Sequence, residues 1–254
     1  SLNVLDPGEV AATGGTSGVV YGVTDVPRPD RFSRVNTFLH VNHEPRRPRY
    51  GVLLCINGTG ILNAWVKKTT VPDMSYPEVN RRCAEIPVGS EGVLMLPFGN
   101  GAERMLGNRY TGAEAIGLDL NRHDRFHLLR AAQEGIAFAF RYGMDVMRET
   151  GLRLRVIRAG YANLFLSPVF RQTLATLCGA DIELYNTDGA LGAARGAALG
   201  AGLYASREET FASLRKIDEV RPDPADRDVL ERGYARWKAE LENRLGRASH
   251  GTSV

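Results

Sequence analysis

The chain has 254 residues, of which 43% are hydrophobic and 24% are charged, a composition typical of a globular protein with its own core. A net charge of +3 is too small and too scattered to indicate nucleic-acid binding, and no apolar run is long enough for a membrane span or fits a signal peptide. The three cysteines, Cys55, Cys83 and Cys178, lie far apart, which predicts buried free thiols in a reducing, cytoplasmic compartment.

The first half of the chain reads as strands followed by helices. Alternating and β-branched runs predict strands over residues 10–14, 18–24, 36–42 and 50–56. Helical spacing of apolar residues follows over 61–69, and a second short helix is expected over 76–86. "EGVLMLPF" predicts a buried strand, and the glycine-rich stretch 99–124 after it predicts a long functional loop.

The second half alternates between helices and strands. An apolar stripe at helical spacing predicts a long helix over 124–149, in which Gly135 and Gly143 indicate close packing against a neighbour. Strands are expected over 152–160 and 181–185, and helices over 166–178, 190–204 and 226–245. Hairpin strands followed by βαβα units indicate an α/β fold with a mixed sheet flanked by helices.

Four glycine-rich stretches are the candidate functional motifs. They are "GGTSG" (14–18), "NGTG" (57–60), "RAGYAN" (158–163) and "NTDGALGAARGAALGAG" (186–202). Each one alone is explained by a tight connection, and "GGTSG" by an ordinary hairpin. Together they favour a nucleotide cleft, because glycine lets a phosphate or a base approach the backbone and helix N-termini attract anions. None is a Walker loop or the dinucleotide fingerprint G-x-G-x-x-G.

Other conspicuous residues have simpler interpretations. His123 and His127 could ligate a metal, but no third ligand follows at a suitable spacing, so a solvated helix end is favoured. Trp65 and Trp237 lie on apolar helix faces and are expected in the core. The Glu103-Arg104 pair in the long loop either orients a substrate or clamps a neighbouring loop, and we favour the clamp.

The motifs, taken in order over residues 8–212, resemble those of the FGGY carbohydrate kinases. "TGGTSGVV" resembles their phosphate hairpin, and "PFGNGAERMLGNRYTGAEAIGLDLNRHD" (97–124) resembles their P-x-x-x-G-E-R-x-P loop. "LLRAAQEGIAFAFRYGMDVM" resembles their long helix, "RAGYANLFLSPVFRQTLATLCGADIEL" their adenosine-binding segment and "DGALGAARGAALGAGLY" their closing helix. The combination is specific although each piece is weak. "TSGVV" and "INGTGILNAW" are most similar to the xylulokinase branch of the family.

The resemblance implies a ribonuclease H-like domain of the actin-like ATPase fold. Two such domains enclose ATP, and residues 1–254 match the second, nucleotide-binding one, with 221–254 as its C-terminal helix and tail. Thr16 is expected to contact the terminal phosphates, with Gly15 and Ser17 beside it, and Gly60 to lie near the α-phosphate. The adenosine is expected at Ala159, Gly160 and Asn163, where the family's glycine pair is Ala159-Gly160 and the register can slip by one residue.

The resemblance also implies that half of the enzyme lies elsewhere. The family's general base is an aspartate in a Gly-x-Gly-Asp-x-x-Ala segment that would precede Ser1. A second phosphate hairpin and nearly all sugar contacts belong to the same first domain. We therefore expect the chain to be part of a longer protein and assign it no catalytic residue and no metal ligand. ATP and Mg²⁺ are the implied cofactors. The implied partner is a sugar, with no nucleic acid and no membrane, and a homodimer is left open.

The reaction implied is transfer of the γ-phosphoryl group of ATP to a sugar hydroxyl, with D-xylulose giving D-xylulose 5-phosphate as the first hypothesis. Two alternatives stay open. One is a kinase of the same family for another sugar or polyol, such as gluconate, ribulose or glycerol. The other is a non-catalytic nucleotide-binding module of the same fold.

Overall fold

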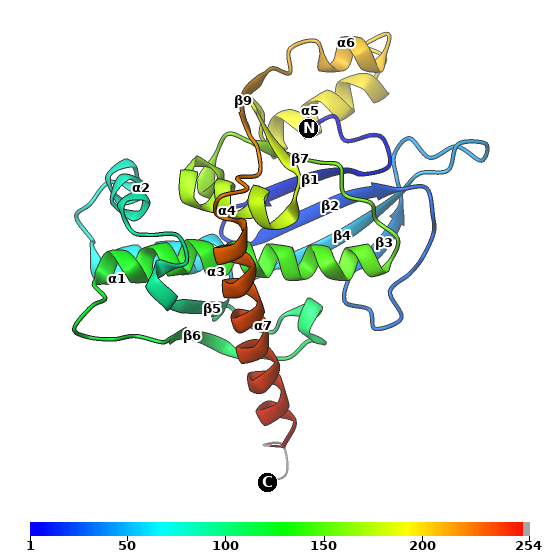
Figure 1. Cartoon of the computed structure of the whole chain (residues 1–254). Coiled ribbons are helices and arrows are strands. Elements are labelled where there is room, and N and C mark those ends of the chain that lie inside the picture. Colours follow the sequence, from blue (N-terminus) through cyan, green and yellow to red (C-terminus); the bar gives the residue numbers. More distant parts are fainter. Residues whose placement is uncertain (251–254) are drawn as a thin grey trace.

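The structure is a computed structural model that describes residues 1–250, and a twisted sheet forms its centre (Figure 1). Within these residues the sheet has seven strands in the order β3-β4-β2-β1-β7-β8-β9. Their bounds are β1 Glu9–Gly14, β2 Gly18–Thr24, β3 Asn36–Leu39, β4 Tyr50–Ile56, β7 Val156–Gly160, β8 Asp181–Tyr185 and β9 Lys216–Val220. The pairs β1–β7 and β7–β8 are parallel and the other pairs are antiparallel, so the expected mixed sheet is confirmed.

Helices cover both faces of the sheet. The side facing the viewer in Figure 1 carries α1 (Gly60–Thr70), α2 (Tyr76–Glu85), α3 (Arg125–Glu149), α4 (Pro168–Cys178) and α7 (Arg227–His250). A two-stranded sheet of β5 (Leu94–Phe98) and β6 (Gly112–Ile116) packs below α3. The other sheet face, where Ala11 and Tyr21 point, carries the N-terminal segment together with α5 (Gly189–Gly200) and α6 (Arg207–Phe211).

The long helix α3 is the centre of the core. Its residues Ile136, Ala139 and Phe140 are fully buried, as the apolar stripe predicts. A Cβ at Gly135 would lie 2.1 Å from the Met95 carbonyl oxygen, and one at Gly143 would lie 2.2 Å from Leu54 Cδ2. The close packing expected at both glycines is therefore confirmed: only glycine lets α3 approach β5 and β4 so closely.

The C-terminal helix α7 closes this core from outside. Its buried residues Leu230, Tyr234, Trp237 and Leu241 are the apolar face that the sequence predicts. Trp237 is fully buried, and its indole N–H donates to the Met95 carbonyl over 2.8 Å. That bond satisfies the polar edge of the ring, as a buried tryptophan requires.

The secondary structure differs from the prediction in three segments of the chain. The stretch 99–124 is not a continuous loop: it contains β6, which pairs with β5 from Leu94↔Ile116 to Phe98↔Gly112. "GAEAI" is short and half-exposed, so its sequence carries little strand signal. The strand expected over 36–42 ends at Leu39, and α6 and β9 lie where no element was predicted.

Some side chains also differ from expectation. Trp65 is 63% exposed, because α1 buries Leu62, Asn63 and Val66 instead. Cys83 and Cys178 are buried free thiols as predicted, whereas Cys55 is exposed. His127 is not solvated: it is buried and forms a capping box with Asp124, whose Oδ1 accepts from the backbone N–H groups of Phe126 and His127.

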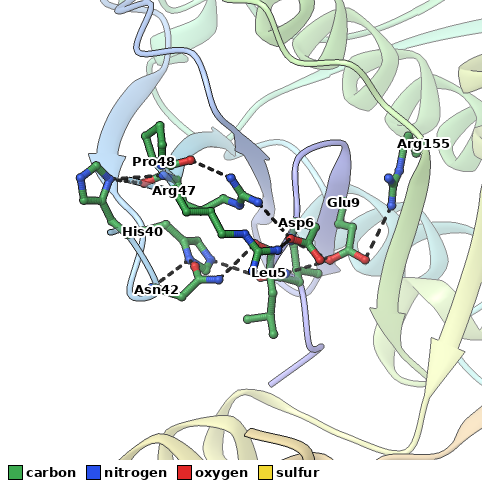
Figure 2. A network of polar contacts seen from close by, with 11 residues as sticks. Leu5, Asp6, Glu9, His40, Asn42, Arg47, Pro48 and Arg155 are labelled. Carbon is green, nitrogen blue, oxygen red and sulfur yellow. Dashed lines mark hydrogen bonds and ion pairs between the residues drawn. The ribbon is translucent and has the colours of Figure 1, made fainter. Parts of the chain in front are cut away.

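A polar network fixes the segment that precedes β1 (Figure 2). Glu9 Oε2 accepts from the backbone N–H groups of Leu5 (2.8 Å) and Asp6 (3.0 Å), and Asp6 pairs with Arg47 over 3.0 Å. Asn42 Nδ2 donates to the Leu5 carbonyl over 3.2 Å. We call this region the polar end of the sheet. The opposite end of β1 carries the glycine-rich turn.

Candidate nucleotide-binding cleft

The glycine-rich stretch 14–18 is a β-hairpin tip, as one reading of the sequence predicts. β1 and β2 pair antiparallel up to Gly14↔Gly18, which leaves Gly15, Thr16 and Ser17 as the turn. The hydroxyl of Thr16 is exposed and makes no hydrogen bond within residues 1–250. It is therefore available to a ligand.

The hairpin tip docks on the N-terminus of α1. The backbone N–H of Gly60 donates to the Gly15 carbonyl and that of Ile61 to the Thr16 carbonyl, both over 3.0 Å. The first N–H groups of a helix lack acceptors inside the helix, and here the tip supplies them. A Cβ on residue 60 would lie 2.2 Å from the Gly15 oxygen, so this contact requires glycine. Gly60 thus holds the hairpin, and its N–H is not free for an anion.

The side chain of Glu103 holds the loop 57–60 in place. Its carboxylate is fully buried and accepts from the backbone N–H groups of Asn57 (3.0 Å) and Gly58 (2.9 Å). Burial raises the pKa of this carboxyl, and the two N–H donors partly oppose the rise. The clamping role favoured for the Glu103-Arg104 pair agrees with this geometry, and Arg104 Nε donates to the Ser33 carbonyl over 2.7 Å.

These elements surround a cleft with a volume of about 440 Å³. Four of the residues expected at the nucleotide line it: Gly15 and Thr16 from the hairpin, Gly60 from α1 and Asn163 from the turn after β7. Sequence segments that are more than 140 positions apart along the chain therefore meet at one place. Glycine-rich turns around one cavity are typical of phosphate-binding sites. The N-terminus of α1 contributes its dipole to this cavity and not free N–H groups, because those of Gly60 and Ile61 donate to the hairpin tip.

A smaller cavity of about 120 Å³ adjoins the cleft, sharing Gly14 and Asn163 with it. Gly160 lines this second cavity, opposite Thr187, Asp188 and Gly189 from the turn that starts α5. A Cβ on residue 160 would lie 2.4 Å from the Thr187 carbonyl oxygen, so the two turns touch through glycine. The fourth glycine-rich stretch thereby reaches the same region as the other three.

Two of the expected residues lie beside the cavities without lining them. Ala159 is fully buried on β7 and belongs to the core, so it supports the turn from behind. Ser17 is exposed at the hairpin tip, next to Thr16. Their contacts with a nucleotide stay predictions.

Several lining residues were not predicted. Asn63 comes from α1, Tyr76 and Asn80 come from α2, and Ser167 is the N-cap of α4. Asparagines inside predicted helices carry no local motif, and only the packing of α1 and α2 against α3 turns them toward the cleft. The one available signal was the cost of asparagine within a helix.

No candidate metal centre accompanies the cleft. Within residues 1–250 no group of three or more His, Cys, Asp or Glu side chains is arranged to hold a metal ion. In the same residues, no helix combines the length and the apolar character that a membrane span needs.

The comparison with known proteins agrees with the geometry of the cleft. Residues 10–205 match the family model of the "FGGY family of carbohydrate kinases, C-terminal domain". The chain belongs to this family. The resemblance to the FGGY carbohydrate kinases that the sequence motifs indicated is thus confirmed.

Relatives extend the match over most of the chain. A xylulose kinase of Haemophilus influenzae is 27% identical over 237 residues, which cover 89% of this chain and 45% of that protein. An L-xylulose/3-keto-L-gulonate kinase of Escherichia coli is 30% identical over 173 residues, covering 65% of this chain and 33% of that protein. The chain thus spans less than half of the length of these relatives.

A solved structure supports the fold. The xylulose kinase of Rhodospirillum rubrum superimposes with a TM-score of 0.82 at 26% identity, over 98% of this chain and 49% of that one. The mixed sheet flanked by helices is the actin-like ATPase fold of the FGGY kinases, as the sequence predicted.

Proposed function

We propose that this chain is the nucleotide-binding C-terminal domain of an ATP-dependent carbohydrate kinase. The observation that carries the proposal is the meeting of the hairpin tip, the N-terminus of α1 and the turn after β7 around one cleft. Phosphoryl transfer depends chiefly on positioning the phosphates and stabilising their charge, which such backbone-lined turns do. The family membership supports the same reaction class.

The substrate that we propose is D-xylulose, phosphorylated at O5. Its support is the match to relatives named xylulose kinase. A second candidate, another ketose or sugar acid, is favoured by the similarity to the L-xylulose/3-keto-L-gulonate kinase. The two are separated by comparing kcat/KM for D-xylulose, L-xylulose and 3-keto-L-gulonate in the longer protein that contains this chain.

The metal ion is proposed to enter with the nucleotide. No carboxylate lines the 440 Å³ cleft, and Mg²⁺ in kinases is bound by phosphates together with one or two carboxylates. This cleft therefore supplies Mg²⁺ with no carboxylate ligand of its own. When bound, the ion neutralises charge on the phosphates, and the residues of this chain position the nucleotide.

The general base and most sugar contacts are proposed to lie outside this chain. The isolated 254-residue chain should then fold but should not turn over D-xylulose, because general-base help alone is worth about 10²–10⁴ in rate. The test is ADP release by the purified chain with ATP, Mg²⁺ and D-xylulose. Turnover comparable with that of a complete sugar kinase would overturn this division of labour.

Nucleotide recognition is proposed to rest on the turn 159–163 and on the start of α5. In the longer protein, Gly160→Val should weaken ATP binding, since even a Cβ there would collide with the Thr187 carbonyl. Binding of D-xylulose should be nearly unchanged. Equal loss of both affinities in a folded variant would contradict the assignment. A longer protein that binds ATP but phosphorylates no sugar would instead favour a non-catalytic module.

A further inference from the structure

Polar side chains from several helices meet behind the cleft. Gln133, on α3, is fully buried. Its Nε2 donates to Asn80 Oδ1 on α2 over 3.3 Å and to Asn63 Oδ1 on α1 over 3.5 Å. Its Oε1 accepts from Ser167 Oγ over 2.7 Å, at the start of α4. Asn63, Asn80 and Ser167 line the cleft, whereas Gln133 lies behind them.

The direction of these hydrogen bonds follows from the N-cap at Ser167. Its Oγ accepts from the backbone N–H of Phe170 over 3.2 Å, so its hydroxyl proton is left to donate to Gln133 Oε1. The carbonyl of the Gln133 amide therefore faces Ser167, and its NH₂ group faces the two asparagines. An NH₂ group can only donate, so both asparagines must turn their oxygens toward it.

The asparagine oxygens are thus used by Gln133, and the asparagine NH₂ groups remain as possible donors to a ligand. Neither Asn63 Nδ2 nor Asn80 Nδ2 has a hydrogen-bond partner in the described part of the chain. Asn63 is 8% exposed, yet its Nδ2 is not among the fully buried side-chain atoms of the described residues that lack a partner, so the little surface it keeps faces the cleft that it lines. The walls beside these donors are apolar or aromatic, from Leu164, Leu166 and Tyr76.

A second contact fixes α2 at the required distance from α3. Arg130, three residues before Gln133, donates from Nη1 to the carbonyls of Cys83 (3.1 Å) and Ile86 (2.8 Å) at the end of α2. Its charge is matched by Glu134, whose Oε1 accepts from Arg130 Nε over 2.7 Å. Asn80 is therefore placed by the backbone of α2, and Gln133 determines which end of its amide faces the cleft.

We propose that Gln133 is a positioning residue that presents the NH₂ groups of Asn63 and Asn80 as a donor pair to the nucleoside part of the bound nucleotide. The inference rests on the proposed function and adds the chemistry by which the cleft selects its ligand. The ring nitrogens of a purine and the ribose oxygens are acceptors, and the apolar walls suit the faces of a base. The phosphates are left to the Gly15 and Thr16 side of the cleft.

The direct test follows side-chain amide signals by NMR in the longer protein that contains this chain, without any substitution. Mg-ATP should shift the NH₂ signals of Asn63 and Asn80 together with the backbone signals of Gly15 and Gly60. Magnesium tripolyphosphate, which has no nucleoside, should shift the two glycines and leave both asparagines unmoved. If ATP shifts the glycine signals but not the asparagine signals, the proposed donor pair is wrong and the nucleotide-binding function still stands.

The second test uses a substitution that removes the hydrogen bonds which orient the two asparagines and keeps the side-chain volume at position 133 nearly unchanged. Gln133→Met should weaken ATP binding about tenfold, the cost of roughly one to two hydrogen bonds, with tripolyphosphate binding unchanged. Gln172→Met is the matched control, because Gln172 on α4 bonds Thr176 and Arg221 away from the cleft. Unchanged ATP affinity in a folded Gln133→Met chain would contradict the positioning role. If ATP shifts no signal at all, the proposed function of this chain fails with it.

Discussion

The two ends of the central sheet are built on different principles. At the hairpin end, contacts are made by backbone atoms: Gly60 N–H to Gly15, Ile61 N–H to Thr16, and a buried carboxylate under loop 57–60. At the polar end, the buried Glu9 also accepts from the backbone N–H groups of Leu5 and Asp6. The exposed side chains of Arg47 and Arg155 add ion pairs there, Arg47 to Asp6 and Arg155 to Glu9 (Figure 2).

The difference shows how a fold can leave room for a ligand. Both ends border a cavity. The one of about 240 Å³ at the polar end is lined by long or charged side chains such as Asp6, Asn42 and Arg47, whereas small residues and backbone bonds border the cleft of about 440 Å³ at the hairpin end. A site made in this way should be sensitive to single added carbon atoms. An end held by exposed ion pairs should tolerate substitution, because such pairs contribute little net free energy.

The largest effect is expected from Glu103→Ala at the hairpin end. The substitution leaves the buried N–H groups of Asn57 and Gly58 without an acceptor, and hydrogen bonds to a charged group contribute about 1.5–3 kcal/mol each. The free energy of unfolding, measured with urea, should fall by about 3–5 kcal/mol. Glu114→Ala, at a half-exposed carboxylate of β6 that meets Arg244 over 3.5 Å, is the control and should change it little. Similar losses in both variants would refute the clamp.

A second test compares two glycines of the same cleft. Gly60→Ala places a Cβ 2.2 Å from the Gly15 oxygen, whereas Gly15→Ala meets its nearest neighbour, the Ser17 oxygen, at 3.6 Å. Overpacking of this kind costs about 1–3 kcal/mol. We expect that loss for Gly60→Ala, with weaker ATP binding, and almost no loss of stability for Gly15→Ala. Thermal unfolding of the two variants measures the difference, and equal melting temperatures would show that the hairpin tip does not depend on Gly60.

A third test uses pH and Asp30, in the loop after β2. Hydrogen bonds from Arg34 hold the pKa of Asp30 below its ordinary value of 3.8. A lowered folded-state pKa stabilises the protein above the unfolded value, and this stability is lost as the pH falls through the folded value. Wild type should therefore exceed Asp30→Asn in stability near neutral pH, with a gap that narrows below about pH 3.8.

The control for Asp30 is Asp73→Asn, which removes an exposed carboxylate that makes no hydrogen bond within residues 1–250. Urea midpoints of the three proteins across the acid range provide the measurement. A gap between wild type and Asp30→Asn that stays constant below pH 3.8 would assign the effect to packing instead of charge.

The smallest effect is expected from Arg47→Ala at the polar end. The side chain of Arg47 is 62% exposed and that of its partner Asp6 is 46% exposed, so the loss in unfolding free energy should stay below about 0.5 kcal/mol. Arg49, whose side chain is 11% exposed on the same carboxylate, should cost more when replaced by alanine. A loss for Arg47→Ala that equals that of Glu103→Ala would erase the contrast between the two ends.

The strongly patterned elements could be predicted from local sequence alone. β2, β4 and β8 have the predicted bounds, and α3 begins at Arg125, directly after its predicted start. β6 and the exposure of Trp65 were missed for one reason. A weakly patterned strand forms because β5 offers it a partner, and a helix face is buried or exposed according to what packs on it.

The same division holds for the cleft. Its glycines could be identified from the sequence as candidate site residues. A turn in which two backbone segments approach closely needs glycine, wherever the turn lies in the fold. Gln133, Asn63 and Asn80 could not be identified as site residues in this way. The neighbours of an amide side chain on a helix are fixed only when that helix packs against others.

The sequence by itself therefore determined the strongly patterned strands and helices, the hairpin tip with Thr16 and the family resemblance, because these depend on residues that are neighbours along the chain. Only the tertiary structure decided that Gly15, Gly60 and Asn163 border one cavity and that Glu103 holds loop 57–60. It alone placed an amide of α3 behind two asparagines of other helices. Contacts between distant segments arise from burial and complementary hydrogen bonding, which no stretch of sequence specifies on its own.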